Sequence, residues 1–369
     1  MKISFTGDLF LGGDLTNYKS SPFEMKSIIS SDLIISNLES PITDIKETIK
    51  SSCTLYAPTK TINHLKKFNI NIVCLANNHI HDKGKEGFFD TIKILKENNI
   101  SYFGAGKNLS EAQKGIKLTN ELIVFGFCEK SKYMKNIKTA TITDYGVNPL
   151  TEENIQHCLK TLNKNQKAIL YFHWGREHVY FPPIENIILA KKLLKNDKVH
   201  SIIGNHSHLA QGYIKHNNKI AYFSLGNFLF PNFYLKPRNH ITYPENNKTN
   251  KKTKSTTLYY KVSELTYKKW KKKNRRSIII TLDTTTNTFK HELTLQDSNK
   301  PILKKIKPRF SIKILNYIYT LNHHVYKFVF NILFNSYFYF IAIKYPQIMY
   351  HLFVYKKPRK LIEKEQEYN

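Results

Sequence analysis

Short apolar runs alternate with longer segments of helical periodicity over residues 1–230. Helical spacing predicts helices over 86–98, 153–162 and 184–195, and in the first of these Phe88 and Leu95 share one face. Strands that alternate with helices in this way are typical of an α/β domain. The runs with strand character are 2–6, 32–36, 70–76, 101–103, 121–127, 168–172, 199–203 and 220–224.

The pattern changes after residue 230. Residues 231–276 are rich in Asn, Lys, Thr and aromatic residues, and we expect a solvated insertion or loop there. Two apolar runs, 277–282 and 288–295, flank a Thr/Asn-rich turn and predict a β-hairpin. We therefore predict one α/β domain over residues 1–300 that contains a basic insertion at 231–276.

The composition narrows the class of protein. A chain of 369 residues with 41% hydrophobic residues can bury a large core, which excludes disorder over the whole chain. The 57 Lys and Arg residues outnumber 28 Asp and Glu, and most of these charges are expected to solvate helix faces. Residues 236–276 differ, because this segment contains 14 basic residues and only two acidic ones, Glu245 and Glu264. A nucleic-acid partner is the least favoured interpretation, since no nucleic-acid motif accompanies this charge.

The cysteines and the N-terminus favour a reducing compartment. Cys53, Cys74, Cys128 and Cys158 are widely spaced and form no CxxC pair, so neither a zinc ribbon nor a disulfide framework is indicated. The first residues enter a strand-like run without the apolar stretch of a signal peptide. We expect a cytoplasmic protein.

Polar side chains recur at the ends of the predicted strands. In α/β sheets the carboxyl ends of strands line a common rim, so these residues are expected to converge. Each alone is more often a cap, a turn residue or a hydrogen-bonded core residue, but together they are hard to assign to chance. Carboxylate, amide and imidazole donors gathered in this way fit Zn, Mn or Fe at a hydrolytic centre. The residues are Asp8, Glu39, Asn77, Asn78, His79, His173, His206 and His208.

These residues fall in motifs that resemble the CapA family of proteins associated with poly-γ-glutamate capsule synthesis. The resemblance covers about residues 1–235 and weakens through the hairpin. The matching motifs are Gly7-Asp8, Asn37-Leu38-Glu39, Leu75-Ala76-Asn77-Asn78-His79 with Asp82, Gly84 and Gly87, Gly104-Ala105-Gly106, His173-Trp174-Gly175 with Glu177, Gly204-Asn205-His206-Ser207-His208, and Ser224-Leu225-Gly226-Asn227-Phe228.

CapA domains are similar to calcineurin-like metallophosphoesterases, which implies a four-layer α/β/β/α sandwich with one or two divalent metal ions at the strand rim. By position, Asp8 resembles the first-strand carboxylate ligand and Glu39 stands where that superfamily has a bridging Asp. Asn78 resembles the ligand amide and His79 the proton donor beside it. The resemblance implies that the remaining ligands are His173, His206 and His208.

Four further polar residues belong to the motifs and are expected around the ligands or facing the substrate: Asn77, Asp82, Glu177 and Asn227. The chain departs from the pattern at two positions. Phosphoesterases generally have a histidine two residues after the first carboxylate, where this chain has Phe10, so one metal position is incomplete. Asn205 stands where the family usually has His.

The resemblance implies a metal-dependent hydrolase that acts in the biosynthesis or export of a capsule or another surface polymer, with an anionic polymer as substrate. The alternative is a metal-binding accessory protein without catalysis. Phe10 favours the accessory protein, whereas the intact Asn78-His79 pair favours the enzyme.

A helical, aromatic-rich appendage is expected over residues 301–369. Its most apolar window, 328–343, is interrupted by polar residues and reaches only about 24 Å as a helix, short of the ~30 Å hydrocarbon core. A spanning helix, a helix packed on the main domain and an interfacial helix all remain open. Flanking Lys327 and Lys344 and the Tyr and Phe content lead us to predict peripheral, salt-sensitive contact with the inner membrane face.

Overall fold

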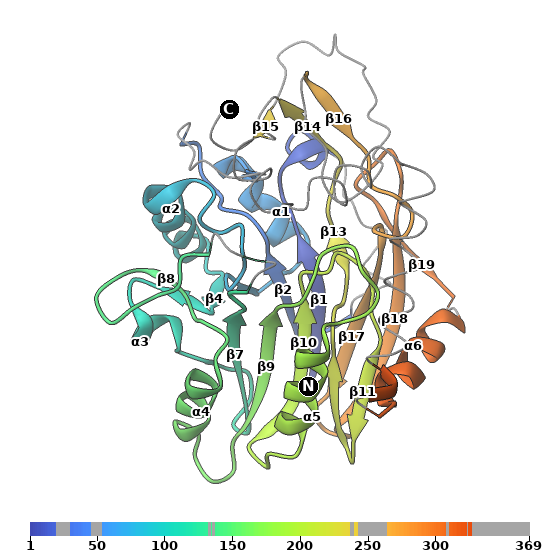
Figure 1. Ribbon diagram of the computed structural model, residues 1–369. Coiled ribbons are helices and arrows are strands. Elements are labelled where there is room, and N and C mark those ends of the chain that lie inside the picture. The colour runs from blue at the N-terminus through green and yellow to red at the C-terminus, as the bar shows by residue number, and fades with distance from the viewer. Residues whose placement is uncertain are drawn as a thin grey trace, which may run out of the picture. The chain divides into compact units, whose positions relative to one another are not determined.

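The computed structural model describes residues 1–19, 30–45, 54–131, 134, 137–236, 240–242, 264–307, 310–322 and 324–326. The chain divides into two compact units, Met1–Tyr319 and Thr320–Asn369. The first unit carries both large sheets (Figure 1). It also contains every predicted site residue. The aromatic window 328–343 lies outside the described residues. None of the helices in the described ranges is long and apolar enough to cross a membrane.

The first sheet is built around the strand that opens the chain. Residues 3–9 are buried without interruption, as expected for a strand covered on both faces. Its parallel neighbours come from the first hundred residues, and the predicted hairpin pairs antiparallel on its other side. Among the described residues the order is β19 (Leu303–Ile306), β18 (Thr288–Gln296), β17 (Arg276–Asp283), β1 (Lys2–Leu9), β2 (Leu33–Leu38), β3 (Ile72–Cys74) and β4 (Ser101–Phe103), with β13 (Asn227–Leu229) beside β1.

The second sheet comes from the middle of the chain. Its central strands are parallel and apolar, and an antiparallel strand closes each edge. In the described part of the chain the order is β11 (Tyr213–His216), β12 (Lys219–Tyr222), β10 (Val199–Asn205), β9 (Lys167–His173), β7 (Leu122–Cys128) and β6 (Ile116–Lys117). Two short strands, β5 (Ala105–Gly106) and β8 (Gly146–Val147), pair beside it.

The two sheets pack face to face over an apolar core. Tyr171 of β9 crosses this layer, because its hydroxyl donates to the Thr6 carbonyl at 2.7 Å and its ring lies 5.8 Å from that of Phe103. Phe5 and Ile203, from opposite sheets, are both buried in this core. The hydrophobic effect of burying such side chains holds the two sheets together. The predicted α/β/β/α class is confirmed by this pair of sheets with helices outside them.

Helices cover the outer faces of the sandwich. α5 packs on β10 and β12, and α2 lies along β4 with Phe88 and Leu95 buried (Figure 1). The α4 N-terminus is capped by the Thr151 hydroxyl, which accepts from the Asn154 N–H. The three predicted helices are found as α2, α4 and α5, each end within two residues of expectation. The helices are α1 (Ile62–Lys67), α2 (Gly84–Glu97), α3 (Leu109–Ala112), α4 (Glu152–Lys160), α5 (Ile184–Leu194) and α6 (Phe310–Thr320), with 3-10 turns η1 (Gly13–Leu15) and η3 (Thr59–Thr61).

The basic insertion is more ordered than its composition predicted. We expected a solvated loop over 231–276, but its described part forms a three-stranded antiparallel sheet, β15 (His240–Thr242), β14 (Phe233–Lys236) and β16 (Thr266–Lys268). The physical reason is an aromatic core, in which Phe233 and Trp270 pack on Phe10 and Phe230. Because lysines separate these aromatic residues in the sequence, the apolar periodicity of the strands was not recognisable.

Two of the strands that extend further than predicted include a residue that we placed after them. We placed Asp8 after the first strand, but β1 continues through Leu9, because the backbone of Asp8 pairs with β2 and β13. His173 is likewise the last residue of β9 rather than the first after it. Both side chains are therefore held by the hydrogen-bonded sheet and not by a loop.

Candidate metal centre

Four strand ends from the two sheets bring the predicted ligands to one rim. In the first sheet Asp8 lies in β1 and Glu39 directly follows β2. In the second sheet β9 ends at His173 and β10 ends at Asn205, immediately before His206. Parallel pairing sets His173 opposite Asn205. The imidazole of His173 and that of His206, the residue after Asn205, therefore lie at the same end of the sheet. Sheet register thus positions this part of the site.

Glu39, His173 and His206 form the first ligand group. Their donor atoms all lie within 4.8 Å of one another, and the three side chains are buried. His173 Nε2 lies 3.0 Å from His206 Nδ1 and 3.8 Å from Glu39 Oε1. A carboxylate and two imidazoles at this separation are suited to hold one divalent ion.

Asp8, Glu39 and His208 form the second ligand group, again within 4.8 Å. His208 Nε2 lies 3.5 Å from Glu39 Oε1, and its Nδ1 lies 3.4 Å from Asp8 Oδ2. The Asn227 side-chain oxygen is 2.8 Å from the same Nδ1 and accepts its proton. This bond fixes the tautomer of His208 that leaves the Nε2 lone pair free toward Glu39.

Glu39 is the residue that both groups share. Its carboxylate is fully buried, and neither oxygen has a hydrogen-bond partner among the described residues. Burial raises the pKa of Glu39 well above its ordinary value, and the nearby charge of Asp8 raises it further. A buried carboxylate without a donor is costly to the fold, which indicates that a cation completes this site.

The imidazoles are held in the form that binds metal. Burial lowers the pKa of His206 to about 4, and burial together with the neighbouring His206 holds the pKa of His173 well below its usual range. Both rings are therefore neutral at pH 7, which is the state that donates a lone pair to a metal ion. His206 Nε2 also lacks a partner within the described chain.

The loop after β10 is strained where it presents two ligands. His206 and His208 have φ of 92° and 53°, a region that residues other than glycine rarely adopt. The His206 N–H points at the Asp8 carboxylate, 3.3 Å from Oδ2, and the Ser207 hydroxyl donates to the Leu209 carbonyl at 2.8 Å. Backbone strain held in place by such bonds is characteristic of functional sites.

The donor set fits a divalent Mn, Zn or Fe ion. It offers two carboxylates and three imidazoles, and the Asn78 side-chain oxygen lies 2.8 Å from His173 Nε2, beside the first group. Nitrogen and oxygen ligands of this mixture suit all three metals. Such an ion would satisfy the Glu39 oxygens, which have no protein partner in the described ranges.

His79 lies next to the ligands and is oriented by an acid. Its Nδ1 donates to Asp82 Oδ2 at 2.7 Å, and the same oxygen accepts the Leu55 N–H at 2.7 Å. Burial acts to lower the pKa of His79, but the charge and hydrogen bond of Asp82 outweigh it and raise that pKa. The bond to Asp82 uses Nδ1 and leaves Nε2 as the second ring nitrogen of His79.

Comparison with known proteins places the chain in a family. The family described as "Bacterial capsule synthesis protein PGA_cap" matches residues 2–232. The chain belongs to this family. The match includes Asp8, Glu39, His79, His173 and every other predicted site residue, since the last of them, Asn227, precedes residue 232.

Two named relatives and one solved structure are similar to this capsule synthesis family member. "PGA biosynthesis protein CapA" of Bacillus subtilis (strain 168) is 27% identical over 252 residues, 64% of this chain and 65% of the relative. "Capsule biosynthesis protein CapA" of Bacillus anthracis is 26% identical over 253 residues, 62% of this chain and 60% of the relative. The chain therefore spans less than two thirds of either relative. The crystal structure of the protein TT1561 of Thermus thermophilus covers 79% of this chain and 97% of its own, with 9% identity and a TM-score of 0.39.

Not every predicted residue of this family member reaches the ligand groups. Asn77 is buried and donates to the Leu38 carbonyl at 2.8 Å, while its own oxygen accepts the His79 N–H at 3.1 Å. It also donates to the Asn37 side-chain oxygen at 3.2 Å, which connects it to a residue that hydrogen-bonds the ligand Asp8. The side chain of Glu177 is 43% exposed and lies 3.9 Å from His178 Nε2, outside both ligand groups.

The structure also locates the two departures from the family pattern. Phe10 is fully buried and points into the aromatic core, with its ring 5.1 Å from Phe230 and 5.8 Å from Phe233. It lies outside both ligand groups, so the second group depends on Asp8 without a histidine two residues later. Asn205 is buried at the end of β10.

Sequence reasoning missed Asn37 as a site residue. Its side-chain nitrogen donates to Asp8 Oδ1 at 2.8 Å and lies 3.3 Å from His173 Nδ1, so it positions ligands from both sheets. A signal was present, because residues two apart in an extended chain share a face and Asn37 precedes Glu39 by two. His178, Asn274 and Trp270, which also contact His208 or its loop, carry no comparable signal.

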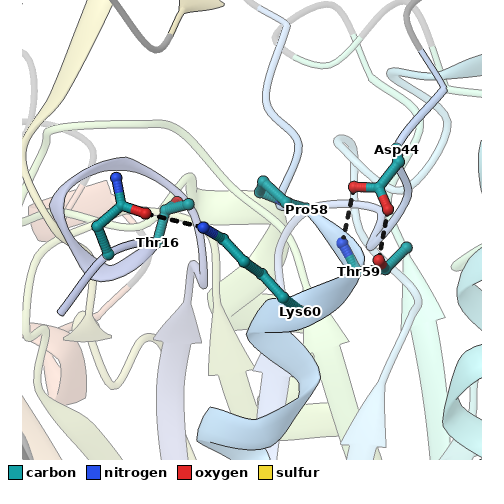
Figure 2. A pocket seen from close by; sticks show the side chains of 6 residues that line it. Thr16, Asp44, Pro58, Thr59 and Lys60 are labelled. Carbon is teal, nitrogen blue, oxygen red and sulfur yellow. Dashed lines mark hydrogen bonds between the residues drawn. The ribbon is translucent and has the colours of Figure 1, made fainter. Parts of the chain in front are cut away.

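A hollow of about 340 Å³ shares no residue with the metal centre of this protein. Figure 2 shows Asp44 hydrogen-bonded to Thr59 at this hollow. Lys60 Nζ donates to the Asn17 oxygen at 2.8 Å, and the Thr59 N–H donates to Asp44 Oδ1 at 3.1 Å. Because these groups already satisfy each other, we assign this hollow no function. Its lining residues are Thr16, Asn17, Asp44, Pro58, Thr59 and Lys60.

Proposed function

We propose that this protein is a metal-dependent hydrolase of the phosphoesterase type that acts in the biosynthesis or export of a capsule or a similar surface polymer. The pair of buried ligand groups that share Glu39 carries the proposal, because a cation would satisfy the buried oxygens of Glu39. The names of two relatives refer to PGA biosynthesis and capsule biosynthesis, which supports an anionic polymer of the poly-γ-glutamate kind as substrate.

The proposed ligands are Asp8, Glu39, Asn78, His173, His206 and His208. When bound, a divalent ion would polarise a substrate oxygen as a Lewis acid and lower the pKa of water, so that hydroxide is available as the nucleophile at neutral pH. The chain contributes the positioning, since register fixes Asp8 and His173, and the hydrogen bond from His208 Nδ1 to Asn227 fixes the His208 tautomer.

His79 acts as the proton donor to the leaving group in this proposal. Asp82 accepts from Nδ1, so a protonated His79 presents its second proton on Nε2. The raised pKa of His79 increases the protonated fraction near neutral pH. Asp82 is itself fixed by the Leu55 N–H, which keeps the imidazole plane oriented.

Metal analysis combined with hydrolysis assays tests this function. Purified protein should contain at least one Mn, Zn or Fe ion per chain, and hydrolysis of a phosphodiester or a γ-glutamyl probe should require that ion. Glu39→Gln provides the matched variant, because it keeps the side-chain shape and removes the shared charge. Metal-loaded protein that hydrolyses neither probe contradicts the enzymatic part of the proposal.

A second candidate is a metal-binding accessory protein in a polymer synthesis or export complex. Phe10 favours it, because a buried aromatic residue in the apolar core leaves the second group one histidine short. This second hypothesis predicts full metal content and no turnover on either probe. It also predicts that His79→Ala leaves the function of the protein in the cell unchanged.

We place the protein in the cytoplasm, in peripheral contact with the inner membrane face through its C-terminal segment. The aromatic and lysine content of residues 310–356 motivates this proposal. Truncation after Lys307 should abolish salt-sensitive binding to anionic vesicles. Full-length protein that stays wholly soluble at low salt contradicts it, and resistance to carbonate extraction would indicate a spanning segment instead.

A further inference from the structure

The basic insertion supplies one wall of the metal centre. β16 ends at Lys268, and Trp270 follows it. The ring of Trp270 lies 5.8 Å from that of the proposed ligand His208 and 6.0 Å from that of His178. Asn274 ties the same segment to the site, because its side-chain nitrogen donates to the His208 carbonyl at 3.2 Å. The end of the insertion is therefore packed against a ligand-bearing loop.

The Lys268 ammonium is held over this wall. Its Nζ lies 4.3 Å from the ring centroid of Trp270 and 5.3 Å from that of Phe233, within the range of cation–π attraction. Trp270 is itself fixed, since its indole N–H donates to the Pro231 carbonyl and its backbone N–H donates to the Asn232 side chain. The same indole ring thus contacts the Lys268 ammonium and packs beside the imidazole of His208.

The charge of Lys268 acts on both sides of the centre. It opposes the rise that Asp82 causes in the pKa of His79, which lies between β3 and α2. It also adds to the effect of burial, the main cause that lowers the pKa of His178 to about 3. His178 follows β9 in the other sheet, and its ring lies 5.5 Å from that of the proposed ligand His208, so the charge of Lys268 reaches the loop that carries this ligand.

We propose that Lys268 determines substrate specificity by binding an anionic group of the polymer next to the unit held at the metal centre. The inference rests on the proposed function for the identity of that centre. A pre-positioned ammonium loses little side-chain entropy on contact with a carboxylate or phosphate. The Glu177 carboxylate, 3.9 Å from His178 Nε2, carries the opposite charge, so Lys268 supplies attraction where repulsion would otherwise act on an anion.

Binding of labelled polyanions to the metal-loaded protein tests this role. The probes are fluorescein-labelled poly-γ-glutamate and polyphosphate of similar length, measured by fluorescence anisotropy at low and moderate salt. Lys268→Gln should weaken binding of the preferred probe about fivefold or more, whereas Lys268→Arg should stay within about twofold of wild type. The matched control is Lys269→Gln, whose exposed ammonium donates to Asn299 instead and whose loss should have little effect.

The two probes separate carboxylate from phosphate recognition. Equal weakening by Lys268→Gln and Lys269→Gln would overturn the inference, because general charge would then explain the binding. Wild-type protein that binds neither probe would also overturn it. Metal content and hydrolysis are measured separately, so a protein without turnover whose binding still depends on Lys268 contradicts only the proposed enzymatic function.

Discussion

Glu39→Gln should have opposite effects on stability with and without metal. In the metal-free protein it removes a buried carboxylate that has no hydrogen-bond partner within the described chain, and such a group costs about 1–3 kcal/mol or more when charged. The metal-free variant should therefore gain free energy of unfolding at pH 8. With metal in excess, wild type gains about 2.7 kcal/mol at a hundred times Kd, and the variant should lose most of this gain.

The sign of the pH dependence follows from the raised pKa of Glu39. The folded protein keeps this proton to a higher pH than the unfolded chain, whose carboxyl titrates near 4.5. Metal-free wild type should therefore lose stability as pH rises from 4.5 toward the folded pKa. Gln has no proton to lose, so the difference between variant and wild type should grow across this window and be small below it.

Urea unfolding in EDTA and in Mn²⁺, at pH 5 and pH 8, measures these differences. Trp174 and Trp270 are both buried and report on unfolding by fluorescence. The matched control is Glu292→Gln, because Glu292 is also buried but lies 3.3 Å from Lys290 and bonds Lys305. It should lose stability and keep the metal response. If Glu39→Gln behaves like Glu292→Gln, the cation-binding interpretation of Glu39 is wrong.

The remaining variants separate ligands, proton donor and core. His206→Ala and His208→Ala should each lower the metal content measured by mass spectrometry while circular dichroism stays unchanged. His79→Ala should keep the metal and lower turnover about 10²–10⁴-fold. Asp82→Asn should move the alkaline limb of the pH–rate profile to lower pH, because Asp82 raises the pKa of His79 against burial. Phe10→Ala should cost about 3–5 kcal/mol in urea unfolding without loss of metal.

The α/β class could be predicted because the strands are buried on both faces and therefore continuous in apolar residues, whereas the four-layer sandwich was implied only by the resemblance to the CapA family. The same property placed the polar residues that interrupt or end these runs at one rim. What the pattern could not give was the exact strand ends, since Asp8 and His173 are polar residues held inside the hydrogen-bonded ladder. Pairing with neighbouring strands decided their position, and pairing is not visible along one strand.

The wall of the site was beyond sequence reasoning for a different reason. Trp270 meets His208 only through tertiary packing of a segment that looks solvated from its composition. Its aromatic residues are separated by lysines and lie far along the chain from the strand ends they cover. Asn37 could more easily have been predicted as a site residue, because it precedes Glu39 by two. However, an asparagine that orients a ligand has the same local sequence pattern as one that caps a turn.

The central claim is that a cation lies between the two ligand groups that share Glu39. Anomalous diffraction at the manganese edge, from crystals grown with Mn²⁺, tests it most directly. The account predicts a peak bounded by Glu39 and at least two of the imidazoles of His173, His206 and His208. A map without a peak there at saturating Mn²⁺, or with its peak elsewhere on the protein, would contradict it.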